Sequence, residues 1–404
     1  MSHVTSCFEQ IIDPSNRANP YPLYAELRKT PVMPLADGTW LVSSYQAIVD
    51  LLHDPRVSSD ARNNPGLDGE SNAVAPAFIA LDPPEHDRLR DIATRPFGPP
   101  HTPSRIEGLR SWVLETTTRL IDDLDGKDVI DIVDEFAYPL PVNVICRLLA
   151  VPTEDEPLFH RLADAVVESM DPNKGTLAER RRRRHELSAE LRAYLSGLVD
   201  ARLDAQGDDL LSAFLAADEP DQQMSRDDLL ATAQLLLIAG HETTVNAIAN
   251  GMLTLLRHPE ILERLRREPN LIIGLVEELL RYEPPVHMLQ SRVALADIDI
   301  GGTTIPTGAP ITLVLAAGNL DPDRFSNPDR FDPDRTDNQH LGFGGGIHYC
   351  FGAPLARMET QIALTELARR LVDPRLVEDP PPYRPSPMLR GPRHLLVEID
   401  GIAR

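Results

Sequence analysis

Apolar side chains recur at helical spacing along most of this chain. Residues 111–124 (SWVLETTTRLIDDL) and 136–152 (FAYPLPVNVICRLLAVP) show the pattern clearly, and residues 39–54 join a short strand-like run to a helical one. Apolar positions three and four residues apart indicate helices with one face in the core. Alternation typical of strands is confined mainly to residues 297–316 and 393–401. Few strands among many helices predict a mainly α protein with a small β portion.

The longest predicted helix begins at Ser225 and continues to Arg257, just before Pro259. Ser225 is followed three residues later by Asp228, which is a helix start of the capping-box type. At about 1.5 Å per residue this helix is about 50 Å long, enough to cross the whole protein.

The middle of this helix carries the sequence AGHETT, residues 239–244. Gly240 costs a helix interior about 1 kcal/mol relative to alanine, and Glu242 and Thr243 place a carboxyl and a hydroxyl in an apolar stretch. On an ordinary helix, a glycine for close packing and an acid paired with a basic residue would explain the pattern. The coincidence of all three residues favours a functional site. In such a site the acid–alcohol pair relays protons into a groove that the glycine opens.

Length, charge and cysteine content exclude several classes of protein. The 404 residues are 42% hydrophobic, contain no repeat and spread their 37 prolines between periodic segments, so we expect one domain covering residues 1–404. A net charge of −22 argues against nucleic-acid binding. The longest apolar block, residues 235–240, is far too short for a membrane span, and the polar N-terminal stretch has no signal-peptide pattern. We expect a soluble, cytoplasmic monomer without a disulfide framework.

A single cysteine, Cys350, stands in the glycine-rich stretch FGGGIHYCFG, residues 343–352, directly before a predicted helix. The dipole and free N–H groups of a helix N-terminus lower the pKa of a thiol. The glycines let backbone N–H groups approach the sulfur and let a flat, bulky group approach the chain. Three interpretations compete: a buried structural cysteine, as we expect for Cys146, a nucleophile with His348 as its base, or an axial metal ligand beside a macrocycle.

The same stretch resembles the cysteine-loop signature F-G-x-G-x-H-x-C-x-G of the cytochrome P450 family of haem-thiolate monooxygenases, position for position. Three further segments match in order and spacing: EELLR, with Glu278 and Arg281; AGHETT, similar to the family's oxygen-activation motif; and DPPEHDRLR, residues 82–90, similar to its haem-facing segment. The resemblance covers nearly the whole chain and implies the cytochrome P450 fold of a soluble bacterial member, with the long central helix over haem b.

The resemblance also implies roles for residues around the haem. Cys350 is then the proximal iron ligand, and its thiolate pushes electron density onto the iron. Phe343 is expected to pack near the sulfur, and Gly240 and Gly352 to lie against the haem. Four cationic or imidazole side chains are expected to hold the two propionates: His86, Arg90, Arg292 and His348.

Two further pairs take their roles from the resemblance. Thr243 matches the oxygen-activating alcohol and Glu242 the adjacent acid, so we expect both to be catalytic. Glu278 and Arg281 match a pair buried behind the haem that locks the segment leading to the cysteine loop; that role is structural.

Substrate and partners are less sharply indicated. The resemblance implies dioxygen, a separate ferredoxin with its reductase (or a flavodoxin) docked around the cysteine loop near Arg357, and an apolar small molecule. Fatty acid, terpenoid, steroid, macrolide and aromatic substrates all remain open. The expected pocket is mainly apolar, with His287 or Gln290 as polar groups, and an entry lid is expected within residues 152–180. The pocket-lining residues are expected to be Ala75, Phe78, Leu236, Leu237, Val286, His287, Met288, Leu289 and Met388.

Other interpretations of the chain are a peroxide-driven peroxygenase and a non-catalytic haem-binding interaction module. Peroxide-using relatives often lack the acid–alcohol pair, and recruitment modules typically lose this pair or the cysteine, so the presence of Glu242, Thr243 and Cys350 favours a monooxygenase. The arginine run 180–184 could meet an acidic partner, but a solvated helix face is the favoured interpretation.

Overall fold

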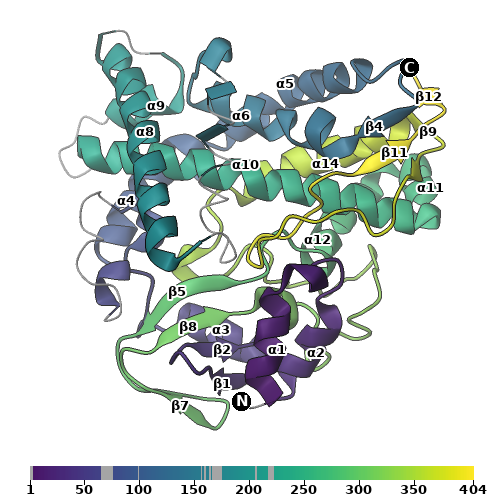
Figure 1. The fold of residues 1–404 in the computed structure, drawn as a ribbon. Coiled ribbons are helices and arrows are strands. Elements are labelled where there is room, and N and C mark those ends of the chain that lie inside the picture. The colour runs from purple at the N-terminus through teal and green to yellow at the C-terminus, as the bar shows by residue number, and fades with distance from the viewer. Residues whose placement is uncertain are drawn as a thin grey trace.

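Helices dominate the computed structural model, which describes residues 3–64, 76–98, 100–155, 157–158, 161–162, 165, 175–204, 207–216 and 223–404. Figure 1 shows most of them gathered in one part of the molecule, with the largest sheet on the other side. The main helices of that helical part are α4 (Glu85–Phe97), α5 (Pro103–Asp122), α6 (Pro139–Leu148), α8 (Leu177–Asp204), α9 (Leu210–Leu215), α10 (Arg226–Arg257), α11 (Pro259–Arg267), α12 (Ile272–Tyr282) and α14 (Ala353–Arg370).

Helix α10 forms the axis of the helical part, as predicted. Its N-cap is Ser225, whose side chain accepts a hydrogen bond from the backbone N–H of Asp228 at 3.1 Å, while the Asp228 carboxylate accepts one from the N–H of Ser225 at 3.4 Å. The helix ends at Arg257 because Pro259 starts α11. It packs against α6, α8, α12 and α14 and crosses the centre of the helical part in Figure 1. The predicted central helix is confirmed within one residue at each end.

A five-stranded sheet lies beside the helical part, in the order β1 (Val32–Pro34), β2 (Trp40–Val42), β8 (Pro310–Leu313), β5 (Leu289–Ala294) and β3 (Val57–Ser58). Strands β2 and β8 are parallel and the other neighbours antiparallel. α3 (Tyr45–His53) follows β2, so residues 39–54 form the predicted strand and helix. α1 (His3–Ile12) and α2 (Tyr21–Arg28) flank the sheet in Figure 1.

Smaller sheets complete the fold. β6 (Ile298–Ile300) pairs with β7 (Thr303–Ile305), β9 (Leu371–Val372) with β12 (Gly401–Ile402), and β11 (Leu396–Glu398) lies between β10 (Arg375–Leu376) and β4 (Val129–Asp131). The strands predicted within 297–316 and 393–401 are therefore present. The short helix α13 (Leu315–Gly318) follows β8.

Within the described ranges, no helix has both the length and the apolar character required to cross a lipid bilayer. The three cysteines are free thiols; Cys7 and Cys146 are buried and Cys350 is partly exposed. Cys146 lies in the main apolar core on α6, as expected for a structural cysteine.

Candidate active site

The cysteine loop, residues 343–352, is held by its own backbone. The N–H of Cys350 donates to the carbonyl of Phe343 at 2.9 Å, which closes the loop. Gly344 and Gly346 have φ of +68° and +61°, a conformation that favours glycine. A Cβ on Gly346 would lie 2.0 Å from the carbonyl oxygen of Leu52 at the end of α3. From the sequence we expected the glycines of this loop to make room for a flat ligand. At Gly346, glycine is required for another reason: the backbone of Leu52 leaves no space for a side chain.

Opposing effects act on the Cys350 thiol. Burial raises its pKa, while hydrogen bonds from the backbone N–H groups of Gly352 and Ala353, and the charges of Arg90 and Arg357, lower it. Gly352 is the N-cap of α14, and a Cβ there would meet nothing within 4 Å. The net effect raises the pKa of the Cys350 thiol, because desolvation outweighs the influence of the helix N-terminus. The lowered pKa expected from the sequence is therefore wrong. The two N–H groups still point at the sulfur, and coordination to a metal deprotonates a thiol outright.

A layer of charged side chains supports this loop from behind. The guanidinium of Arg357 lies 4.5 Å from the ring centroid of Phe343, donates to the Tyr349 hydroxyl at 3.2 Å and pairs with Glu277 at 2.6 Å. Burial raises the pKa of Glu277, but the hydrogen bonds from Arg357 and His340 outweigh burial and hold that pKa at about 2. Arg357 is thus bound into the support of Phe343, an arrangement that sequence reasoning did not predict when it placed Arg357 at a docking surface.

Four nitrogen-bearing side chains converge beside the loop from three elements. His86 and Arg90 come from α4, Arg292 from β5 and His348 from the 3-10 turn Gly346–His348. The rings of His86 and His348 lie 4.5 Å apart, and Arg90 donates to the carbonyl of Tyr349 at 2.5 Å. Burial, and the charges of Arg292, His86 and Arg90, lower the pKa of His348 to about 3. The structure therefore brings together all four residues that the sequence assigned to an anionic group.

Polar atoms in this cluster are left without partners. His86 Nε2 and His348 Nδ1 are buried and have no hydrogen-bond partner among the described residues. Burial also lowers the pKa of Arg292. Buried polar groups are normally satisfied, so these two ring nitrogens are available to hydrogen-bond a bound group, and the binding of an acidic group stays a prediction. Sequence reasoning missed Ser59, whose hydroxyl lies 2.8 Å from His348 Nε2; no motif marks this residue.

The two adjacent side chains of the acid–alcohol pair on α10, Glu242 and Thr243, contact different partners. Glu242 is 1% exposed, with Oε1 3.1 Å from Arg384 Nε and 3.4 Å from Asn246 Nδ2. The hydroxyl of Thr243 instead donates to the carbonyl of Ala239 at 2.8 Å. The two adjacent residues therefore face different partners, and their joint action stays a prediction.

Gly240 has an ordinary packing environment. A Cβ on Gly240 would lie 3.5 Å from Ile145 Cδ1 on α6, which is a normal van der Waals distance. The side of Gly240 that lacks a side chain therefore faces α6, and alanine would fit sterically. This geometry gives no support to the idea that Gly240 opens a groove.

Glu278 and Arg281 form a fully buried pair on α12. Arg281 Nε and Nη2 donate to the two oxygens of Glu278 at 2.8 and 2.7 Å, and both side chains are 0% exposed. Arg281 also donates to the carbonyls of Asn319 and Pro328, and the N–H of Asp332 donates to Glu278 at 2.9 Å. The pair therefore holds the segment that precedes the cysteine loop.

The predicted substrate walls are only partly brought together. The N–H of His287 donates to the carbonyl of Met388 at 2.8 Å, and Val286 forms a bridge with Leu389, so segments 285–290 and 386–389 are neighbours. Leu236 and Leu237 are both buried in the main core. Ala75 and 14 of the 29 residues of the predicted lid lie outside the described residues.

Four predicted pocket residues have other contacts. The Phe78 ring packs 5.5 Å from that of Phe351 and 6.5 Å from that of His86, next to the cysteine loop. His287 Nδ1 lies 2.7 Å from the Tyr24 hydroxyl, and Met288 is buried in the core formed with α1 and α2. Leu289 packs at the edge of the core around the sheet, and Gln290 is exposed. Tertiary packing on the N-terminal helices, which the local sequence does not reveal, accounts for Met288 and His287.

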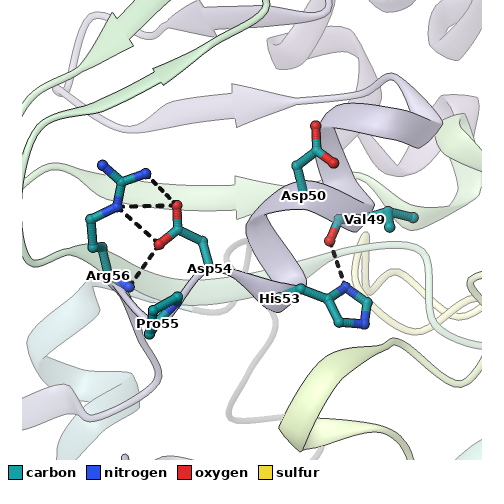
Figure 2. A pocket seen from close by; sticks show the side chains of 6 residues that line it. All are labelled: Val49, Asp50, His53, Asp54, Pro55 and Arg56. Atoms are coloured by element: carbon teal, nitrogen blue, oxygen red, sulfur yellow. Dashed lines mark hydrogen bonds and ion pairs between the residues drawn. The ribbon is translucent and has the colours of Figure 1, made fainter.

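A surface hollow of about 650 Å³ lies at the end of α3 (Figure 2) and is lined by Val49, Asp50, His53, Asp54, Pro55 and Arg56. His53 Nδ1 donates to the carbonyl of Val49 at 2.8 Å, and Arg56 pairs with Asp54 at 2.6 Å. Its charges are largely satisfied within the hollow, so it offers no catalytic arrangement. Arg182, Arg183 and Arg184 of the arginine run are exposed on α8, as a solvated helix face requires.

Comparison with known proteins agrees with this geometry. A family model described as cytochrome P450 matches residues 31–397. The chain is 42% identical to cytochrome P450 monooxygenase PikC of Streptomyces venezuelae over 388 residues, covering 93% of this chain and 89% of that protein. It is 38% identical to 6-deoxyerythronolide B hydroxylase of Saccharopolyspora erythraea over 400 residues, 94% of this chain and 96% of that protein. The ligand-free crystal structure of CYP164A2 from Mycobacterium smegmatis superposes with a TM-score of 0.89 at 38% identity, covering 98% of this chain and 100% of that one.

Proposed function

This chain belongs to the cytochrome P450 family, which binds haem b and acts as a monooxygenase, and on that premise we propose its substrate class, its electron donor and the roles of its residues. It inserts one oxygen atom from dioxygen into an apolar small molecule, using electrons from a separate ferredoxin and its reductase. Macrocyclic polyketides and sterol-like molecules are the first substrate classes to test, because relatives include 6-deoxyerythronolide B hydroxylase and vitamin D(3) 25-hydroxylase.

The observation that carries the proposal is the cluster of two arginines and two histidines beside Cys350. Buried His86 Nε2 and His348 Nδ1 without partners among the described residues, together with Arg90 and the half-buried Arg292, fit a group with two carboxylates. In this assignment Cys350 holds the iron, and the four side chains hold the propionates. Bound haem supplies the activation of dioxygen, which a thiolate ligand strengthens by donating electron density.

The remaining roles belong to side chains of the protein. The N–H groups of Gly352 and Ala353 tune the thiolate by hydrogen bonding. With haem bound, the Thr243 hydroxyl would order a water molecule beside it, and Glu242 would carry protons to that water. Leu236 and Leu237 supply an apolar lining that excludes bulk water. The Arg357–Glu277 pair holds Phe343 against the loop around which we propose the ferredoxin docks.

Reconstitution tests the proposal. The purified holoprotein is combined with a ferredoxin, its reductase and NADPH, and 6-deoxyerythronolide B and vitamin D3 are offered as probes under ¹⁸O-labelled dioxygen. We expect a product with one labelled oxygen atom from at least one probe class. Product formed with unlabelled hydrogen peroxide alone, carrying an unlabelled oxygen atom from the peroxide, and no product with the ferredoxin system, would instead assign the chain as a peroxygenase. Replacing ferredoxin by flavodoxin tests the identity of the electron donor.

A further inference from the structure

Arg384 reaches the catalytic candidate Glu242 from a distant part of the chain. Arg384 Nε lies 3.1 Å from Glu242 Oε1, and the two side chains are 15% and 1% exposed. The arginine follows the last helix of the fold by more than a dozen residues, within the segment 383–392. No sequence motif marks it, and the roles proposed above do not include it.

The segment that carries Arg384 is fixed against α10. Tyr383 and Pro392 form an antiparallel bridge, and the N–H of Arg384 donates to the carbonyl of Gly391 at 3.1 Å. Gly391 lies so close to α10 that a Cβ there would stand 2.1 Å from Asn246 Oδ1. Four residues further along α10, Asn250 Nδ2 donates to the carbonyl of Arg390 at 3.0 Å. The backbone around Arg384 therefore has little freedom to move away from Glu242.

Because Glu242 is buried, its carboxylate depends on the ion pair with Arg384 for compensation of its charge. An ionised carboxylate that is taken out of water is strongly destabilised unless a cation and hydrogen bonds compensate it. Asn246 contributes one long hydrogen bond at 3.4 Å, and Arg384 contributes a charge at close range. The guanidinium thus favours the ionised form of Glu242 and holds its carboxylate on the side of α10 that faces segment 383–392.

We propose that Arg384 is a positioning residue for Glu242: it keeps the carboxylate ionised and oriented, so that protons are delivered at the neighbouring Thr243. This inference rests on the proposed function of Glu242 as a proton carrier. The segment that holds Arg384 also carries Met388, whose carbonyl accepts the N–H of His287. The acid is therefore tied to the same segment that forms part of the predicted substrate wall.

A double-mutant cycle on the unfolding of the purified holoprotein tests the pair without turnover. The variants are Arg384→Gln, Glu242→Gln and the double variant, with Arg384→Lys as the conservative substitution. Arg393→Gln is the matched control, because Arg393 is an exposed arginine of the C-terminal region that pairs with Asp134. We expect the double variant to lose clearly less stability than the sum of the single variants. Additive losses would overturn the proposed pairing.

Infrared spectroscopy at neutral pH then reports the state of the acid. Burial raises the pKa of Glu359 to about 8, so this residue should give a protonated carboxyl band in every variant. Arg384→Gln should show a second protonated carboxyl band that Arg384→Lys, the control and Arg384→Gln/Glu242→Gln lack. A purely structural arginine would leave this second band absent in every variant, and that result would overturn the proposal. Should Arg384→Gln fail to fold, Arg384→Met, which keeps an unbranched apolar side chain without the charge, replaces it in the unfolding cycle and in the infrared experiment, with the same expected and contradicting results.

Turnover gives the last readout. With any substrate accepted in the reconstituted system, Arg384→Gln should raise the ratio of hydrogen peroxide to product by about tenfold, as expected when a reacting group is misplaced, and increase the solvent isotope effect. The lysine variant should restore most of the coupling. Normal coupling in Arg384→Gln would contradict the inference and leave the proposed function intact. A wild-type protein without turnover would contradict the proposed function, while the unfolding and infrared experiments would still report on the pair.

Discussion

Replacing Glu278 by glutamine removes the central charge of the buried network behind the cysteine loop. The carboxylate accepts two hydrogen bonds from Arg281, at 2.8 and 2.7 Å, one from the N–H of Asp332 at 2.9 Å, and further ones from Arg335 and Asn338 at 3.2 Å each. Glutamine has nearly the same shape, but it offers one acceptor oxygen and no charge. Arg281 is then left as a fully buried guanidinium without its counter-ion.

The size of the effect follows from that geometry. Breaking a buried ion pair by removing one partner costs about 3–5 kcal/mol. Arg281 keeps its hydrogen bonds to the carbonyls of Asn319, Pro328 and Arg330, so we expect the lower end, about 3 kcal/mol. Since whole proteins are stable by only about 5–15 kcal/mol, the variant should populate partly unfolded forms and incorporate haem poorly.

Urea unfolding followed by circular dichroism and haem absorbance measures this change. The matched control is Glu268→Gln, because Glu268 forms an exposed pair with Arg264 one turn away on the surface, worth about 0.3–0.5 kcal/mol. A Glu278→Gln protein that unfolds at the same urea concentration as Glu268→Gln, with full haem content, would refute the reasoning that this buried pair fixes the segment before the loop.

Three further predictions each concern a single residue. Gly346→Ala should sharply reduce haem content, because its Cβ would collide with the Leu52 carbonyl, whereas Gly108→Ala on α5, where an added Cβ meets nothing within 4 Å, should retain it; equal haem content in the two variants would contradict the contact. Thr243→Ala should divert electrons from product to hydrogen peroxide in the reconstituted system, and unchanged coupling would remove the proton role of this hydroxyl. Burial, with the nearby charges of Arg390 and Arg17, lowers the pKa of His287 well below its usual value. The unfolded chain therefore binds a proton at this residue that the folded chain does not, and stability falls as pH drops below about 6.5, by up to about 1.4 kcal/mol per pH unit. His287→Asn should show a flatter dependence of unfolding free energy on pH, and an unchanged slope would contradict the assignment.

The sequence predicted correctly those features of the fold that depend on residues close together in the chain. The capping box of Ser225 and Asp228 and the stop at Pro259 define α10, because helix ends depend on neighbouring residues. The spacing of Glu278 and Arg281 places both on one face of α12, and the glycine-rich loop around Cys350 is recognisable as a motif. The structure confirms the helix, the buried pair and the position of Cys350 directly before α14, while the role of Cys350 as the iron ligand stays a prediction.

Contacts made across the fold could not be predicted in the same way. Nothing near Glu242 in the sequence indicates Arg384, and nothing near Gly346 indicates that the Leu52 carbonyl fills the space beside it. The pKa of Cys350 depends on burial as well as on the helix that follows it, so the helix alone predicted the wrong direction for the change in this pKa. Met288 was expected in the substrate wall because apolar residues suit both a pocket and a core; only packing on the N-terminal helices distinguishes them.

The most direct test of the central claim is the difference spectrum of the dithionite-reduced protein with and without carbon monoxide. The wild-type protein and Cys146→Ala, which removes a buried core cysteine, should both give the red-shifted Soret band that is specific to thiolate ligation of haem. Cys350→Ala should lose this band. A wild-type protein that binds no haem, or a Cys350→Ala protein that keeps the band, would contradict the assignment of Cys350 as the iron ligand.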